Sequence, residues 1–353
     1  MTRRMRAVVT EKPGGPSVLA IGEVPTPAPG PGQILVRVRA AALNHADIYQ
    51  REGEFPPSPG ESEILGVEIA GDVVALGPGA QTAIGTPVFG LVGGGAYADY
   101  CVIDERMSFE VPPGYSYAEA ASLPEVYFTA DTTMFRLGGL SSGQAVLVHG
   151  GASGLGTACI QMAKSAGARV VCTVGSNAKA ARALALGADR VVNYREQDFV
   201  EEVRAFTGGE GVDLIEDIVG ADYFTRNLSA LKDGGRLLQV GVMSGTMCAL
   251  DLDTIVLRRL QLIGSVMRPL GIEDKRRIAQ RFRERWLPLL AARSLVPVID
   301  SLFDVADVVQ AHERLQRSDH FGKIILDLHR ANDLAAAALH LEATNVHYTR
   351  TAS

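Results

Sequence analysis

The pattern of apolar and polar residues changes character at about residue 145 of the 353-residue chain. Before this point, short apolar stretches are separated by glycine and proline clusters, and they cover residues 5–10, 34–43, 68–76, 87–92 and 96–103. Short strands between regular turn signals are typical of small all-β domains. The chain up to about residue 125 is therefore predicted to form a small, mostly antiparallel β-barrel.

From residue 145 onward, apolar stretches alternate with helical patterns. The predicted strands are 145–149, 169–174, 190–194, 212–219, 235–241 and 260–266, and the predicted helices are 155–166, 177–186, 197–206 and 222–231. Regular alternation of strands and helices predicts parallel β-α-β units. This region is expected to be an α/β domain with a doubly wound, six-stranded parallel sheet.

After residue 267 the pattern departs from this alternation. A charged helix at 273–290, a strand at 296–299, a helix at 305–316 and a strand at 322–328 are expected to return to the first domain. The predicted domains are thus 1–128 with 268–353, and 129–267. The tail, residues 329–353, is either a surface helix with a frayed end or an oligomer contact.

Composition limits the class of protein. The length and the 47% apolar content suit two domains with separate cores. The net charge is −6, and the absence of a basic run argues against nucleic-acid or anionic-membrane partners. Because the sequence has neither a signal-like N-terminal apolar segment nor a stretch of about 18 apolar residues, a soluble, cytoplasmic protein is expected.

Four cysteines are widely spaced within apolar stretches, at Cys101, Cys159, Cys172 and Cys248. Their spacing fits neither a disulfide framework nor a metal clamp. We expect reduced, structural thiols.

A glycine-rich turn joins the first strand of the α/β region to its first helix. Small residues let the backbone approach a diphosphate, and the helix directs free N–H groups at the charge. The pattern predicts a dinucleotide site made of Gly151, Ala152, Ser153, Gly154, Leu155 and Gly156. Ser153, at the middle glycine position, would contact a phosphate or cap the helix.

The end of the next strand favours NADPH over NADH. NAD-binding proteins usually carry Asp or Glu about 20 residues after the glycine turn, to bind the ribose 2′-hydroxyl. Ser176 stands there instead, and Lys179 and Tyr194 belong to the same corner. All three side chains can donate hydrogen bonds to a 2′-phosphate. Alternatively, Lys179 is a solvated helix residue and Tyr194 a packed strand end.

Five sequence blocks carry a family resemblance, at residues 42–47, 64–71, 123–125, 150–156 and 321–324. In order and spacing they resemble the zinc-independent quinone oxidoreductase, or zeta-crystallin-like, branch of the medium-chain dehydrogenases/reductases. The likeness covers about residues 5–328 and is closest to the p53-inducible quinone oxidoreductase subgroup. It implies a GroES-like β-barrel catalytic domain, a Rossmann domain and a homodimer joined through edge strands.

The resemblance also implies that no metal is bound. Zinc-dependent relatives need ligands such as Cys, His and Cys or Glu. Asn44 stands at the first Cys position, Val67 replaces the His that precedes Glu68, and the four-Cys loop is missing between residues 77 and 92. His45 is expected to be a hydrogen-bonded wall residue.

Further site residues follow from the family. Asn44 and Tyr49 are implied to line the nicotinamide and substrate cleft and to orient the acceptor. Cofactor contacts are implied for Asn44, Thr129, Gly241, Val242 and Lys323. Two alternatives stay open: Tyr49 packs on Phe55, or Lys323 is an ordinary strand-edge lysine.

These features together predict an NADPH:quinone oxidoreductase that passes a hydride to a quinone or similar conjugated carbonyl. The protein would supply orientation in a water-poor cleft. One alternative is an NADPH-dependent enone or enoyl-thioester reductase, although Phe55 stands where enoyl reductases often carry a proton-donating Tyr. The other is a non-enzymatic NADPH-binding redox sensor.

Overall fold

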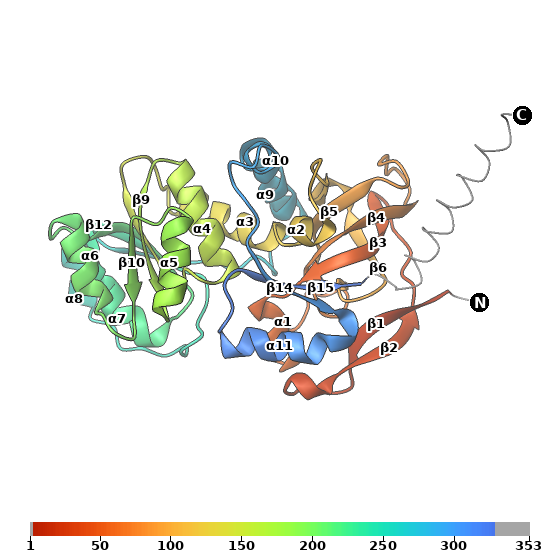
Figure 1. Ribbon diagram of the computed structural model, residues 1–353, viewed down its shortest axis with the longest axis horizontal. Helices are drawn as coiled ribbons and strands as arrows, with labels where there is room; N and C mark the ends of the chain where they lie inside the picture. Colours follow the sequence, from red (N-terminus) through yellow and green to blue (C-terminus); the bar gives the residue numbers. More distant parts are fainter. Residues whose placement is uncertain (1–2, 329–353) are drawn as a thin grey trace, which may run out of the picture.

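The computed structural model describes residues 3–328 and contains two large β-sheets (Figure 1). One sheet has seven strands, and the other has six. The two alternatives for the tail concern residues outside the described part of the chain. Figure 1 shows the sheets side by side, with helix α3 crossing between them.

The N-terminal half supplies a two-stranded ribbon and most of the seven-stranded sheet. Its strands are β1 (Arg4–Thr10), β2 (Leu19–Pro25), β3 (Gln33–Ala42), β4 (Glu68–Leu76), β5 (Pro87–Leu91), β6 (Tyr100–Asp104) and β7 (Ser108–Glu110). All pairings among these strands are antiparallel. The β-rich, antiparallel character predicted for this region is therefore confirmed.

Strands β2 and β7 escaped prediction, and the strand predicted at 96–103 begins only at Tyr100. The preceding apolar residues are buried but bond irregularly: the Tyr97 N–H donates to the Leu65 carbonyl, and the Tyr97 carbonyl accepts from Val8. The apolar residues of this loop led to the prediction of a strand, but they are apolar because the loop is buried.

The doubly wound sheet has the order β10-β9-β8-β11-β12-β13, and every pairing is parallel. The predicted six-stranded parallel sheet is confirmed. Its strands are β8 (Ala145–Val148), β9 (Arg169–Val174), β10 (Arg190–Asn193), β11 (Val212–Asp217), β12 (Leu231–Gln239) and β13 (Gln261–Gly264). The helices are α4 (Gly154–Ser165), α5 (Asn177–Ala185), α6 (Phe199–Thr207), α7 (Ala221–Ala230) and the unpredicted α8 (Leu252–Arg258).

The C-terminal segment returns to the seven-stranded sheet. It contains α9 (Ile272–Arg285), α10 (Leu287–Ala291), β14 (Ile299–Asp304), α11 (Val308–Arg317) and β15 (Lys323–Asp327), and β15 pairs antiparallel with β3. The seven-stranded sheet therefore has the order β14-β15-β3-β4-β5-β7, with β6 also paired to β3. The predicted charged helix is split where Pro288 begins a new turn. The strand predicted at 296–299 was misplaced, because the Gln161 side chain binds both the N–H and the carbonyl of Val296.

A helical segment connects the two sheets. Helices α1 (His45–Arg51) and α2 (Tyr117–Ala121) lie before it, and α3 (Pro124–Ala130) continues into a π-helix at Asp131–Leu137. The Asp131 carboxylate accepts hydrogen bonds from Arg281 and from the indole N–H of Trp286, which ties this segment to α9 and α10. The predicted domain boundary at residues 128 and 129 falls within α3.

Three of the four cysteines match the expectation of buried thiols. Burial raises the pKa of Cys101 and of Cys172 to about 12, and Cys159 is also buried. Cys248 is exposed, so the prediction of a structural role was wrong for this residue. Within residues 3–328, no helix is both long and apolar enough to cross a bilayer.

Candidate active site

A cleft of about 1020 Å³ lies where the two sheets meet. Its walls come from the start of α1, from α3, from the loop before α4 and from the carboxyl ends of β12 and β13. The amino end of β15 closes it on the side of the seven-stranded sheet. This volume suits a sizeable organic ligand.

The glycine-rich turn is held in place by close backbone packing. Gly150 has φ +66°, a left-handed conformation that favours glycine. A Cβ atom on Gly156 would lie 2.2 Å from the Gly150 carbonyl oxygen, and one on Gly151 would lie 2.8 Å from the Cys172 sulfur. The turn therefore needs glycine at positions 151 and 156. It leaves the backbone at the start of α4 without side chains in front of it.

Some of the residues predicted to bind the dinucleotide line the cleft, and the others pack behind them. Ser153, Gly154 and Leu155 line the cleft, whereas Gly151 and Gly156 pack behind them. The Ala152 carbonyl accepts a hydrogen bond of 2.8 Å from the Gly322 N–H, just before β15. The Ser153 hydroxyl caps α4 by accepting from the Gly156 N–H at 2.9 Å, so the capping alternative describes its contact in this structure.

The three residues predicted to select the 2′-phosphate meet at one corner, at the carboxyl ends of β9 and β10. The Ser176 hydroxyl caps α5, accepting from the Lys179 N–H at 3.3 Å, and its own proton stays available to a ligand. The Lys179 ammonium donates to the Ser318 carbonyl at 2.6 Å. The Tyr194 hydroxyl lies against Gly175, next to Ser176: a Cβ atom on Gly175 would be only 2.7 Å from it.

Sequence reasoning missed a further cation at this corner, Arg195. Burial lowers the pKa of Lys179, and the positive charge of Arg195 lowers it further, whereas Asp319 opposes the change. The two cations therefore lie close enough to feel each other's charge. The signal was the position of Arg195, directly after the predicted strand-end Tyr194.

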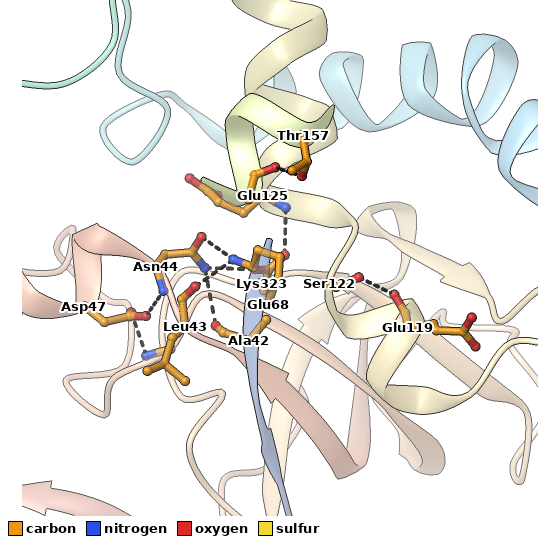
Figure 2. A network of polar contacts seen from close by, with 12 residues as sticks. Ala42, Leu43, Asn44, Asp47, Glu68, Glu119, Ser122, Glu125, Thr157 and Lys323 are labelled. Atoms are coloured by element: carbon orange, nitrogen blue, oxygen red, sulfur yellow. Dashed lines mark hydrogen bonds and ion pairs between the residues drawn. The ribbon is translucent and has the colours of Figure 1, made fainter. Parts of the chain in front are cut away.

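The polar wall of the cleft is built around the Lys323 ammonium (Figure 2). Its nitrogen lies 2.7 Å from the Leu43 carbonyl oxygen, 2.6 Å from Asn44 Oδ1 and 2.7 Å from Glu68 Oε1. Lys323 is 5% exposed and Glu68 is fully buried. Three acceptors for three N–H donors make this a saturated, buried ion pair. It excludes an ordinary strand-edge role for Lys323.

The Asn44 side chain is fixed by the same group. Its amide nitrogen donates to Glu68 Oε1 at 2.9 Å and to the Ala42 carbonyl at 3.3 Å, and its backbone N–H donates to Asp47 at 2.8 Å. Asp47 also accepts from the Tyr97 hydroxyl at 2.9 Å. Asn44 therefore reaches the cleft in a fixed orientation, with its side-chain oxygen accepting from the Lys323 ammonium.

Sequence reasoning missed both Glu68 and Asp47 as parts of the site. Glu68 begins a largely apolar strand, and a carboxylate beside the apolar residues 69 and 70 was the available signal. Its partner Lys323 comes from the other end of the chain, so the pairing itself left no local trace.

The polar wall does not fit a zinc ion. Asn44 and Val67 stand at two positions where zinc-dependent relatives carry a ligand. The Lys323 ammonium is bound to the side-chain oxygens of Asn44 and Glu68, so a second cation would be repelled there. Across residues 3–328, no group of three or more His, Cys, Asp or Glu side chains is arranged to hold a metal. We derive no chemistry through zinc, and the absence of a metal stays a prediction.

The remaining predicted residues line the same cleft: Tyr49, Thr129, Gly241 and Val242. Burial, Glu54 and Glu52 raise the pKa of Tyr49, so its hydroxyl is protonated at neutral pH. The Arg268 guanidinium stacks on the ring of Phe55, with its central carbon 4.3 Å from the ring centroid.

His45 also lines the cleft and is uncharged at neutral pH. Burial lowers its pKa to about 4, helped by His320 and by the positive charge of Lys323. As a wall residue it therefore contributes a neutral imidazole.

Comparison with known proteins places this geometry in a family. Residues 30–113 match the family described as alcohol dehydrogenase GroES-like domain, and residues 154–284 match zinc-binding dehydrogenase. Human quinone oxidoreductase is 29% identical over 327 residues, which cover 91% of this chain and 97% of the relative.

Two solved structures are similar over almost the whole described fold. One, the crystal structure of an NAD-dependent alcohol dehydrogenase, has a TM-score of 0.83 and 34% identity, covering 92% of this chain and 100% of that one. The other, Escherichia coli quinone oxidoreductase complexed with NADPH, has a TM-score of 0.81 and 29% identity, with coverage of 92% and 99%.

The chain therefore belongs to the medium-chain dehydrogenase/reductase superfamily. Within that superfamily it lies in the quinone oxidoreductase-like branch, with a GroES-like N-terminal domain and a Rossmann domain that binds NAD(P). The family resemblance seen in the sequence is therefore confirmed for the superfamily and for this branch of it.

The buried ion pair predicts a stability effect. Lys323→Met should lower the free energy of unfolding by about 3–5 kcal/mol, because the Glu68 carboxylate would stay buried without its cation. Urea unfolding at neutral pH measures this change. The double variant Lys323→Met/Glu68→Gln should recover most of the loss; no recovery would contradict the role given to the charge.

Proposed function

We propose that the protein is an NADPH-dependent quinone oxidoreductase that reduces a quinone or similar conjugated carbonyl without zinc. One observation carries the proposal: the glycine turn and a polar wall centred on the Lys323 ammonium line the same cleft. A nicotinamide cofactor and an acceptor would meet there. We also propose that the chain is nearest to the p53-inducible quinone oxidoreductase subgroup.

The choice of NADPH rests on the corner formed by Ser176, Lys179 and Tyr194, which contains donors where a carboxylate would repel a phosphate. The E. coli relative was crystallised with NADPH, whereas another similar structure is that of an NAD-dependent alcohol dehydrogenase. When bound, NADPH supplies a hydride from C4. Thr129, Gly241 and Val242 would hold the nicotinamide half against the cleft wall, which Lys323 fixes through its three contacts within the protein.

The nature of the acceptor follows from the absence of a Lewis acid in the proposed mechanism. The substrate must then accept a hydride readily, as quinones and activated enones do. The Tyr49 hydroxyl is protonated and would donate a hydrogen bond to the carbonyl oxygen of the acceptor, while Asn44, whose amide is fixed by Glu68, would orient the acceptor as the adjoining wall. Correct placement is worth up to ~7–11 kcal/mol of the barrier.

The direct test follows the loss of NADPH absorbance with 1,4-benzoquinone, 9,10-phenanthrenequinone and crotonyl-CoA, each repeated with NADH and with a chelator. We expect turnover of the quinones, selective for NADPH and insensitive to the chelator. Turnover of crotonyl-CoA alone would replace the proposal by an enoyl-thioester reductase. Tight NADPH binding without turnover of any acceptor would replace it by a redox sensor.

We further propose a homodimer formed through β13 and α8. Strand β13 is an edge of the six-stranded sheet, and Leu252, Val256 and Leu257 on α8 are 66%, 69% and 72% exposed. A second copy of the chain would cover these side chains and pair the free strand edge.

The dimer has its own test. Val256→Asp/Leu257→Asp should shift the mass measured by light scattering from dimer to monomer, because the charges would be buried without partners. Ile84→Asp, at an apolar residue 67% exposed and outside this surface, is the control and should stay dimeric. A wild-type chain that is monomeric would exclude the interface.

Lys179→Ala should weaken NADPH binding about 10–100-fold and leave NADH binding nearly unchanged, because only NADPH carries the 2′-phosphate. Fluorescence titration of both nucleotides measures the two dissociation constants. Lys164→Ala is a matched control, since Lys164 is paired with Asp189 instead. Equal losses for NADPH and NADH would remove the assigned role of Lys179.

Tyr49→Phe should lower kcat/KM for the quinone about 5–10-fold, with NADPH affinity within twofold of the wild type. The variant removes one hydrogen bond to the acceptor and keeps the ring. Steady-state kinetics with a parallel nucleotide titration separate the two quantities. Unchanged kinetics would mean that the tyrosine ring only packs.

A further inference from the structure

Glu125 is an unused carboxyl group in the wall of the cleft. It lies in the first turn of α3, and its backbone N–H donates to Glu68 Oε2 at 2.9 Å. Figure 2 shows its carboxyl end pointing away from Glu68. Among the contacts of residues 3–328, no hydrogen bond or ion pair engages this carboxyl group, although it lies beside the saturated Lys323 group.

The surroundings of Glu125 make it a weak acid. Burial raises its pKa to about 7, and the negative charges of Glu68 and Asp47 act in the same direction. Lys323 and Arg268 oppose the change with their positive charges. A large fraction of Glu125 is therefore protonated at neutral pH, and it can give up that proton without a large cost.

The other titratable groups of this wall suit proton donation less well. All three N–H groups of Lys323 are already directed at acceptors. The pKa of Tyr49 lies above its usual value near 10, and that of His45 falls to about 4. A donor works best when its pKa is close to the working pH, and Glu125 meets this condition.

We propose that Glu125 is a catalytic acid that donates its proton to the oxygen of the conjugated carbonyl acceptor. This inference rests on the proposed function and deepens it. The oxygen of the acceptor would then lie in the cleft near the start of α3. It would face the carboxyl end of Glu125, which points away from Glu68.

The step balances with NADPH and one solvent proton. The acceptor takes a hydride, with its electron pair, from C4 of NADPH, which is oxidised to NADP⁺. The O–H bond of Glu125 breaks and a new O–H bond forms on the acceptor, which is thereby reduced by two electrons. The Glu125 carboxylate then regains a proton from water.

The test is Glu125→Gln, which keeps the shape of the side chain and the backbone contact to Glu68 but has no acidic proton. In the wild type, kcat for quinone reduction should fall as pH rises through about 7, because the acid form is then lost. The variant should lose about 100-fold in kcat or more and should not show this pH dependence. Its NADPH dissociation constant should stay within twofold of the wild type.

Glu216→Gln is the matched control. Glu216 is another buried carboxyl group, whose pKa burial raises to about 8, but it faces Thr133 and does not line the cleft. This variant should keep the wild-type pH profile. A Glu125→Gln enzyme with wild-type kcat and pH profile would overturn the inference while leaving the proposed function intact. A wild-type protein that reduces no quinone or enone would overturn both.

A measurement without turnover separates protonation from folding. The titration uses the nucleotide-free Glu216→Gln variant, which lacks the other buried acid that titrates near neutral pH. Its infrared spectrum should show a protonated-carboxyl band that is lost near pH 7 and is missing from the double variant Glu125→Gln/Glu216→Gln. If the band is absent, or persists in the double variant, Glu125 does not hold a proton at neutral pH and the inference fails.

Discussion

The buried cation of Lys323 is the interaction on which the rest of the cleft depends. It neutralises Glu68, which in turn accepts from the Asn44 amide and from the backbone at the start of α3. One ion pair therefore joins four pieces of chain: the end of β3, the start of β4, helix α3 and strand β15. Removing water from such a pair is costly, and its complete set of hydrogen bonds offsets that cost.

The same arrangement separates two roles for carboxylates that lie close together. Glu68 is held by a cation and two N–H donors, so its charge is used within the protein. Glu125 lies at the cleft wall next to that charge with no partner of its own, so ionisation is disfavoured there. Two neighbouring carboxyl groups thus differ in acidity because of the groups that each one contacts.

Much of the fold could be predicted from the sequence because its signals are local. The alternation of strands and helices, and the glycine turn before α4, depend on residues close together in the chain. The misplaced strand near Val296 and the loop before Tyr100 show the limit, since hydrogen bonds from distant residues decided their conformation. The same holds for the site: Asn44 was expected in the cleft, but its partner Lys323 is 279 residues away.

Gly154 links the two halves of the cleft in a way that its place in a phosphate-binding turn does not reveal. A Cβ at this position would lie 2.4 Å from Cδ of Lys323, whose ammonium is already fixed by three acceptors. The missing side chain at the start of α4 is therefore also the space through which the lysine reaches Glu68. A shorter residue at position 323 would lift this constraint, so the sizes of the side chains at positions 154 and 323 are coupled.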